Sequence, residues 1–222
     1  VGEEASFFAL VDGENAVPMI AAQDHKQVFD GDEGPNTGGM GAYSPAPVVD
    51  QAMTDRIMAD IILPTAKGMV AEGRPYKGVL FAGLMITGDG PKLIEHNVRF
   101  GDPECQVMMM RLKSDMLEAL LACAEGRLNK LKLKWHDDAA LAVVMASNGY
   151  PGTYEKGSVI HGIDKAEEIE NAVVFHAGTD RENGDLIATG GRVLGVCGLA
   201  GTVAKAKTLA YKAVVKIDWP GG

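Results

Sequence analysis

KLIEHNVRFGDPE, residues 92–104, places Glu95, Asn97 and Arg99 at alternate positions and adds two more acids within the next five residues. Alternate side chains of a β-strand share a face, so this spacing predicts one face that carries a carboxylate, an amide oxygen and a guanidinium. Such hard oxygen ligands suit Mg²⁺, which takes one or two protein ligands and fills its shell with water and phosphate oxygens. An arginine beside them can hold a carboxylate or phosphate through two hydrogen bonds.

The alternative for this segment is a solvated strand face on which Glu95 and Arg99 form an ion pair. The asparagine between the charges and the Gly-Asp-Pro-Glu that follows count against it, because they turn the chain and bring in more acids. His96 projects from the opposite face, between apolar neighbours. We predict that its ring packs with its N–H satisfied and does not bind metal.

The composition limits the class of protein. The chain has 222 residues, a formal net charge of -9 and 46% hydrophobic residues, enough for one large domain or two small ones. The acidic balance argues against general binding to nucleic acid, and no apolar run reaches membrane-spanning length. Cys105, Cys123 and Cys197 lie far apart, which predicts reduced thiols in a cytosolic protein with no zinc site or disulfide frame. No signal peptide opens the chain, and it begins directly in a strand-like run, so we expect a fragment of a longer protein.

The first half of the chain shows clear patterns of secondary structure. We expect a hairpin around Asp12-Gly13, a long loop over 24–47, and a strand at 78–86 buried on both faces that turns back into the strand carrying Glu95. Residues 50–73 have helical spacing, with Pro64 kinking or dividing the helix. Ser114 is expected to cap a helix from Asp115 to about Gly126.

A charged stretch at 129–138 marks the predicted domain boundary. Beyond it, the pattern predicts short strands near 140–147, 172–178, 185–191 and 192–200, then an amphipathic helix that starts at Thr202 and turns Ala206, Leu209, Ala210 and Val214 to one side. We therefore predict an α+β chain. Residues 1–128 form an antiparallel sheet with helices, and residues 129–222 form a small, mostly antiparallel β domain with a terminal helix.

A second signal lies in DEGPNTGGMGAYSP, residues 32–45. This segment lacks the ending of a Walker A loop and contains no GxGxxG, so neither motif applies. Gly38, Gly39 and Gly41 let the backbone approach a ligand and aim N–H groups at an anion. The alternative is an ordinary surface loop.

Charged residues near two strand starts are weaker candidates. Asp24, His25 and Lys26 precede the glycine-rich segment and could supply charge to it. Glu3 and Glu4 precede the first apolar run, where a carboxylate could accept both hydroxyls of a ribose. Solvated charge is the alternative for both groups.

Taken in order, these segments resemble an ATP-grasp ligase. More narrowly, QDHK (23–26), GPNTGGMGAYSPAP (34–47) and RFGDPE (99–104) resemble the phosphoribosylamine–glycine ligases, also called glycinamide ribonucleotide synthetases, of purine biosynthesis. The downstream segments VVMASNGYPG, GSVIHGI, VFHAGT and GGRVLGV resemble that family's C-terminal domain. The likeness runs along nearly the whole chain.

The resemblance implies a reaction that needs no protein nucleophile. ATP phosphorylates the carboxylate of glycine, and the amine of 5-phosphoribosylamine attacks the glycyl phosphate to give glycinamide ribonucleotide, ADP and phosphate. It implies ATP with Mg²⁺ or Mn²⁺ and small-molecule substrates, no nucleic acid or membrane partner, a cytoplasmic location, and a longer protein that is a monomer or weak dimer.

The resemblance also assigns residues. Glu95 and Asn97 match the metal-ligand positions, and Glu4 matches the acid that holds the ribose hydroxyls of ATP. Arg99 matches an arginine that faces the acyl phosphate or substrate. Asp102 and Glu104 orient that arginine or the amine. The remaining candidates are Asp24 and Lys26, which approach the substrate, and Asn36, Thr37, Gly38 and Gly39, which bind the phosphate of phosphoribosylamine or the glycine.

Two departures from the family pattern limit these assignments. The run at 78–86 contains no acid, so a second metal held only by protein is not expected. The family chain is also longer, with an N-terminal substrate domain, a glycine-rich flap and an adenine-binding hinge upstream, so we expect little ligase activity from this chain alone. The segment 190–196 could approach the nucleotide, with a buried structural strand as the alternative.

Two other functions stay open from the sequence. One is another ATP-grasp member, such as a purine-pathway carboxylase or transformylase, against which GPNTGGMGAYSP counts. The other is a non-catalytic nucleotide-binding or interaction module.

Overall fold

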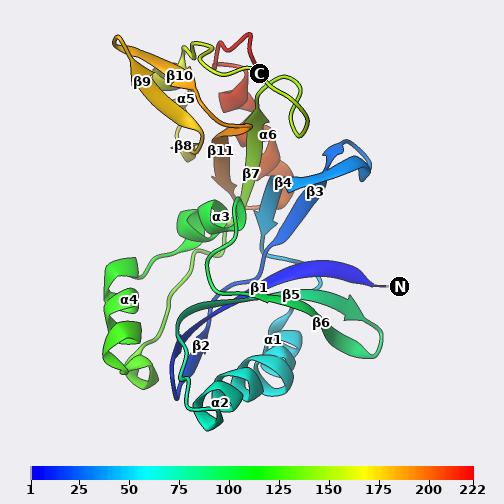
Figure 1. Cartoon of the computed structure of the whole chain (residues 1–222), viewed down its shortest axis with the longest axis vertical. Helices are drawn as coiled ribbons and strands as arrows, with labels where there is room; N and C mark the ends of the chain where they lie inside the picture. Colours follow the sequence, from blue (N-terminus) through cyan, green and yellow to red (C-terminus); the bar gives the residue numbers. More distant parts are fainter. Residues whose placement is uncertain (1) are drawn as a thin grey trace. The chain divides into compact units, whose positions relative to one another are not determined.

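The computed structural model describes residues 2–222, which divide into two compact units (Figure 1). The first unit comprises the chain up to Gln23 together with Ser44–Gly101 and Arg111–His136. The second comprises Asp24–Tyr43, Asp102–Met110 and Asp137–Gly222. The chain passes from the first unit to the second for the last time after His136, within the charged stretch 129–138 that was predicted as the domain boundary. The units are nevertheless not the two continuous segments of the domain prediction, because two internal segments group with the C-terminal part.

The first unit is built on a four-stranded sheet in the order β2-β1-β5-β6. Its pairs are antiparallel, and β1 and β5 run together from Glu3 opposite Ile86 to Asp12 opposite Lys77. The hairpin predicted at Asp12-Gly13 is confirmed, and so is the turn from the central strand into the strand that carries Glu95. The strands are β1 (Glu3–Asp12), β2 (Ala16–Pro18), β5 (Lys77–Thr87) and β6 (Gly90–Asn97).

Both faces of this sheet are covered at β1. Phe7, Ala9 and Val11 belong to a buried cluster that also includes Ile57 and Ile62 from the helices. On the alternate face, Phe8 stacks against Phe81 with ring centroids 4.5 Å apart. The continuous apolar run of β1 and the buried centre of β5 follow from this two-sided burial.

The helical segment after β4 continues past Pro64, and its irregularity is a π-helical turn just before that proline. A π-helical turn, Met58–Ile62, separates α1 (Gln51–Ile57) from α2 (Leu63–Ala71), which has Pro64 in its first turn. Proline has no N–H and its ring crowds the carbonyl four residues back, so the hydrogen bonds widen there. In Figure 1, α1 and α2 run along one face of the first unit's sheet.

The prediction that Ser114 caps the next helix is wrong by one residue. Asp115 is the N-cap of α4 (Met116–Glu125), and its carboxylate accepts hydrogen bonds from the N–H groups of Leu117 and Glu118. The hydroxyl of Ser114 instead accepts a hydrogen bond from the backbone N–H of Lys134 at 2.7 Å. A carboxylate is as good a cap as a hydroxyl, so adjacent candidates are not separated by sequence alone. A short 3₁₀ turn, Leu128–Lys130, follows α4.

The second unit contains a five-stranded sheet in the order β3-β4-β7-β11-β8. The prediction of a long loop over 24–47 is wrong, because most of it forms the strands β3 (Gln23–Phe29) and β4 (Glu33–Ser44). Gly31 and Asp32 turn the chain between them with φ of 74° and 58°. The hairpin was not predicted because its sequence is polar and rich in glycine. The edge strand β3 buries few side chains and therefore shows no alternating apolar pattern.

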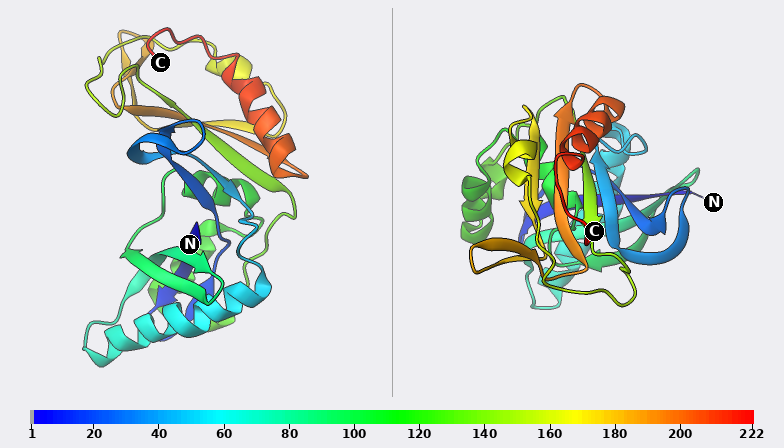
Figure 2. Two further views of the ribbon diagram at one scale, coloured as in Figure 1. Left: turned by 90° about the vertical axis from the view of Figure 1, so that its right-hand side faces the viewer. Right: turned by 90° about the horizontal axis from the view of Figure 1, so that it is seen from above.

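The C-terminal strands are close to their predicted ranges. β11 is central and pairs antiparallel with β7 on one side and β8 on the other. Thr202 caps α6, which lies along the sheet and buries Ala206, Ala210 and Ala213 (Figure 2). The strand β9, which pairs with β10, was not predicted. The elements are α3 (Glu104–Arg111), β7 (Ala139–Ala146), α5 (Ile163–Glu167), β8 (Ala172–His176), β9 (Thr179–Glu182), β10 (Asp185–Ala188), β11 (Arg192–Ala200) and α6 (Val203–Val214).

Within residues 2–222, no helix combines the length and apolar character that crossing a membrane requires. The three cysteines are free thiols. Burial raises the pKa of Cys105 to about 11 and that of Cys197 to about 12, so both are protonated at neutral pH.

Candidate functional site

The two predicted metal ligands lie side by side at the end of β6. Glu95 pairs with Gly83 and Asn97 with Phe81 across the strand, and the amide Nδ2 of Asn97 donates to Glu95 Oε1 at 3.0 Å. The register shifts just before Glu95, between Gly83 and Leu84 of β5. The prediction that both side chains share a face is confirmed.

Arg99 is not part of this strand face. β6 ends at Asn97, and Arg99 lies in the bend that follows, where its Nη1 donates to the carbonyl of Phe100 at 2.7 Å. The strand was predicted to continue to Arg99, but its pairing with β5 ends two residues earlier, at Asn97. Among the described residues, no ion pair joins Glu95 to Arg99, so the simple surface-pair alternative is also wrong.

His96 is oriented toward a helix. Its Nε2 lies 3.2 Å from the hydroxyl of Thr65 on α2, and that hydroxyl donates to the carbonyl of Ile61. A neutral imidazole carries one N–H, so the tautomer of His96 decides the direction of its contact with Thr65. Burial lowers the pKa of the imidazole, although a hydrogen bond with the backbone of Phe81 opposes this shift. The ring therefore has a polar partner, as predicted, but His96 is exposed and is not packed in the core.

The candidates on β1 and β3 lie at exposed or partly exposed positions. Glu4 is opposite Met85, and its backbone carbonyl accepts a hydrogen bond from Gln23 Nε2 at 2.9 Å. Lys26 Nζ lies 4.0 Å from a carboxylate oxygen of Asp24, as expected for alternate residues on one face of β3.

The glycine-rich strand β4 is fixed by hydrogen bonds within the second unit. Thr37 Oγ1 donates to the carbonyl of Lys26 at 2.7 Å and accepts from the N–H of Gly39 at 3.0 Å. The N–H of Gly38 donates to the hydroxyl of Tyr150 at 3.1 Å. Both N–H groups are thus paired with protein atoms in this structure, whereas the sequence predicted that they face an anion. Asn36 is exposed.

Arg192 is a residue that the sequence reasoning did not single out. Its Nη1 donates to the carbonyls of Gly39 at 3.1 Å and Asp102 at 2.7 Å, and its Nη2 donates to the Asp102 carboxylate at 3.1 Å. Gln106 Nε2 donates to the other carboxylate oxygen at 2.9 Å, while the buried Gln106 Oε1 has no partner among the described residues. Arg192 therefore joins β4 to the start of α3, and Asp102 is oriented by this arginine.

Glycines bring the backbone close to this arginine. A Cβ at Gly38 would lie 3.1 Å from three atoms of the Arg192 guanidinium, Cζ, Nε and Nη2. A Cβ at Gly191 would lie 2.3 Å from the ring of Tyr150, and one at Gly190 would lie 3.0 Å from the Cα of Gly178. The only sequence signal for this arrangement was the Gly190-Gly191 dipeptide before Arg192. It could not be interpreted from the sequence, because the residues that these glycines contact lie far away in the chain.

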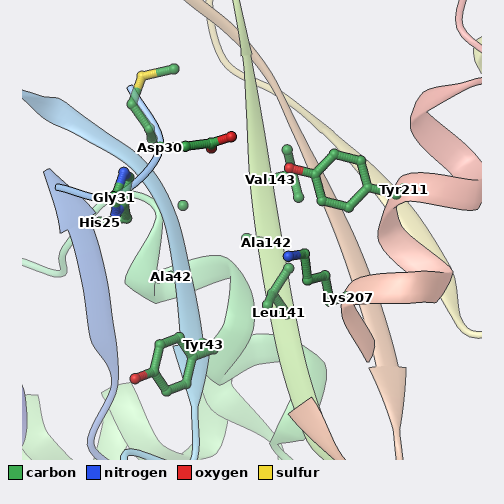
Figure 3. Close-up of a pocket in the computed structure, with 12 residues that line it drawn as sticks. His25, Asp30, Gly31, Ala42, Tyr43, Leu141, Ala142, Val143, Lys207 and Tyr211 are labelled. Carbon is green, nitrogen blue, oxygen red and sulfur yellow. The ribbon is translucent and has the colours of Figure 1, made fainter. Parts of the chain in front are cut away.

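A separate pocket of about 280 Å³ lies in the second unit between the β3-β4 hairpin, β7 and α6 (Figure 3). Leu141 and Val143 line it from β7, and Lys207 and Tyr211 line it from α6. It also contains His25, while the other predicted site residues do not line it.

The donor set at β6 fits a partial magnesium site. Among residues 2–222, no group of three His, Cys, Asp or Glu side chains is placed to hold a metal. One carboxylate and one amide oxygen, adjacent and exposed, instead match a metal that takes the rest of its shell from phosphates and water.

Comparison with known proteins assigns the chain to a family. Residues 1–105 match the domain described as "Phosphoribosylglycinamide synthetase, ATP-grasp (A) domain", and residues 140–222 match the C domain of the same synthetase. Over 225 residues, the chain is 58% identical to phosphoribosylamine–glycine ligase of Vigna unguiculata and covers 72% of it. The chain belongs to the phosphoribosylamine–glycine ligase family.

Other members of the ligase family are equally similar. Identity is 57% over 221 residues to the ligase of Brucella melitensis and 60% over 225 residues to the chloroplastic ligase of Arabidopsis thaliana. These matches cover all of this chain but 52% and 42% of the relatives, so the chain spans about half their length.

Solved structures agree on the fold. The crystal structure of phosphoribosylamine–glycine ligase from Thermotoga maritima superposes with a TM-score of 0.89 at 34% identity, covering 100% of this chain and 54% of that one. Biotin carboxylase of Campylobacter jejuni gives a TM-score of 0.69 at 16% identity, covering 99% of this chain and 46% of that one, which shows a shared fold alone. The predicted α+β, ATP-grasp fold is therefore confirmed.

Proposed function

We propose that the longer protein to which this chain belongs ligates glycine to 5-phosphoribosylamine, with cleavage of ATP to ADP and phosphate, in purine biosynthesis. The observation that carries this proposal is the 57% and 60% identity to named phosphoribosylamine–glycine ligases along the whole chain. The Glu95–Asn97 pair at the end of β6 is consistent with it, since that pair offers oxygen ligands for a metal–nucleotide.

The chemistry is a carboxylate activation followed by attack of an amine. ATP transfers its terminal phosphoryl group to the glycine carboxylate, and the amine of phosphoribosylamine then displaces phosphate from the glycyl phosphate. Neither step needs a protein nucleophile, so the protein acts through position and charge. Mg²⁺ or Mn²⁺, when bound, neutralises charge on the transferring phosphates.

The residues have separate parts in this proposal. Glu95 and Asn97 hold the metal, Glu4 accepts the ribose hydroxyls, and Arg99 faces the acyl phosphate. Asp102 and Lys26 stay in the catalytic set, with Asp102 presented by Arg192. Asp24 and the segment 36–39 bind the substrates; Gly38 and Gly39 then act through the shape of the backbone, because their N–H groups are already paired.

The setting of the longer protein is part of the proposal. We propose a cytoplasmic enzyme, although the chloroplastic name of the Arabidopsis relative indicates that the compartment varies with the organism. The net charge of -9 supports small-molecule partners over nucleic acid, and we propose a monomer or weak dimer. The chain alone is expected to be inactive, because it spans about half of its relatives.

The test is Glu95→Gln in the longer protein. We expect turnover to fall on the order of 10²-fold or more and to require more Mg²⁺, since the amide removes the only charged ligand of the pair. Because Glu95 is exposed, the free energy of unfolding of the Glu95→Gln variant should stay within about 0.5 kcal/mol of that of the parent protein. Glu72→Gln, also exposed in the first unit, is the matched control.

Unchanged turnover and Mg²⁺ dependence in Glu95→Gln would remove the metal assignment. The reaction itself is tested by which substrates release ADP from the parent protein. ADP release that requires glycine and phosphoribosylamine supports the ligase, and release that requires bicarbonate or formate supports a carboxylase or transformylase. If no ADP is released with any of these substrates, a non-catalytic nucleotide-binding module is supported.

A further inference from the structure

The guanidinium of Arg192 has one edge engaged and one edge open. Three of its five N–H groups are used: both on Nη1, and one on Nη2. Within residues 2–222 the structure records no partner for Nε–H or for the second Nη2–H. These two N–H groups lie on the same edge of the planar group, in the spacing that matches two oxygens of a carboxylate or phosphate.

The open edge is held in place from the other side. Asp102 receives two hydrogen bonds from Arg192, through its carbonyl and its carboxylate, and the Gly39 carbonyl receives a third. The Arg192 side chain is only 21% exposed, so it has little freedom to move away. An arginine fixed in this way loses little conformational entropy when it binds a ligand.

Gly38 packs against the face of the Arg192 guanidinium. The position that a Cβ of Gly38 would occupy is 3.1 Å from Cζ, Nε and Nη2, which are the atoms of the open edge. Tyr150 fixes Gly38 through its hydroxyl. Because Gly38 has no side chain, the guanidinium can lie directly against the backbone of β4.

Charge supports the same conclusion. Among residues 2–222, Asp102 is the one carboxylate paired with Arg192, and it is 47% exposed, so the positive charge is only partly neutralised. A guanidinium that lacked a second anion would keep water on its open edge, and a substrate oxyanion can replace that water with two charge-assisted hydrogen bonds.

We propose that Arg192 is a substrate-binding residue that takes an oxyanion on its Nε–H and Nη2–H edge, with Asp102 and Gly39 as the groups that position it. This deepens the proposed function and rests on it for the identity of the ligand. The oxyanion is the carboxylate of glycine or the phosphate of phosphoribosylamine, which share the same recognition chemistry.

The experiment compares Arg192→Lys with the parent in the longer protein. Lysine keeps the charge but loses the two-point geometry, so KM should rise on the order of 10²-fold for one of the two oxyanion substrates while KM for ATP is unchanged. A rise for glycine identifies the carboxylate, and a rise for phosphoribosylamine identifies the phosphate. Arg181→Lys on β9, where the arginine is exposed, is the matched control and should behave as the parent.

A selective rise in one KM is an effect that loosening of the fold does not produce. If Arg192→Lys changes neither KM relative to Arg181→Lys, or changes all three substrates alike, the proposal is overturned. A second measurement covers the case in which the variant does not fold: the Nε–H proton resonance of Arg192 in the parent should shift on titration with glycine alone or inorganic phosphate alone. No shift with either probe would also overturn it.

Failure of the wider proposal gives a different result. A parent protein that makes no glycinamide ribonucleotide contradicts the ligase function, whereas an active parent with an unaffected Arg192→Lys variant contradicts only the oxyanion site. The titration with inorganic phosphate and glycine tests that site even without turnover.

Discussion

The end of β6 and the surroundings of Arg192 present functional groups in opposite ways. At β6, Glu95 and Asn97 come from one strand, are two residues apart, and contact mainly each other. Around Arg192, the groups come from four separate segments of the chain and are tied together by hydrogen bonds and close backbone contacts. The first arrangement leaves side chains available to ligands, and the second fixes a cation before a ligand arrives.

The two regions should therefore differ in whether a substitution lowers activity alone or also lowers the stability of the fold. Substitutions at the β6 end should lower activity with little effect on folding, because the side chains there are exposed. Substitutions around Arg192 should affect stability as well, since they disturb packed backbone.

Gly39→Ala should destabilise the protein by about 2–4 kcal/mol. Gly39 has φ of 113°, and a Cβ there would lie 2.8 Å from Cδ of Pro103. Two effects therefore add: backbone strain and a steric overlap. Urea unfolding of the longer protein measures the loss.

Gly31→Ala is the control for that strain. Gly31 also has positive φ, 74°, but a Cβ there would meet no atom within 4 Å. It should cost about 1 kcal/mol, the backbone penalty alone. Equal losses at Gly31 and Gly39 would mean that the region near Pro103 is not tightly packed, and the contrast between the two regions would weaken.

Asp102→Asn should have an intermediate effect, about 1 kcal/mol in stability and roughly tenfold in kcat/KM. The asparagine amide must direct its NH₂ at a donor, either Arg192 Nη2 or Gln106 Nε2, so one of the two present hydrogen bonds is lost. Steady-state kinetics and urea unfolding check the two values. Asp185→Asn, exposed on β10, is the control.

The double variant with Arg192→Lys sharpens this prediction. If Asp102 acts by positioning Arg192, the two substitutions together should cost much less in kcat/KM than the product of their separate effects. Independent effects would show that Asp102 acts on the substrate by another route.

The smallest effect concerns His96, whose ring contacts Thr65 of α2. Burial lowers the pKa of the folded imidazole below 6.5, so the folded state resists protonation more than the unfolded state. Its contribution to stability is therefore complete above pH 6.5 and is lost as the pH falls toward the folded pKa. Relative to His96→Gln, the parent should lose stability between about pH 7.5 and pH 5. A relative gain over that range would contradict the lowered pKa of His96.

Much of the fold follows from local sequence. The Asp12-Gly13 turn, the apolar run of β5 and the cap at Thr202 each contain their own physical cause within a few residues. The β3-β4 hairpin was missed because an edge strand rich in glycine and polar residues buries little. Its strand character comes from pairing in the sheet, not from a hydrophobic period.

The candidate site divides in the same way. The alternation of Glu95 and Asn97 is a local pattern, and it predicts their shared face. It does not predict that the strand ends before Arg99, because strand length depends on the partner β5. Tyr150 and Arg192 lie 112 and 153 positions from the glycines they contact, so no window of sequence contains both partners.

The two glycines before Arg192 limit how this region can be redesigned. Position 190 is closed by the backbone of Gly178 and position 191 by the Tyr150 ring, so neither admits even a methyl group without displacement. Engineering of a new substrate preference would have to begin at solvent-facing positions such as Asn36, where a library of larger side chains can be accommodated.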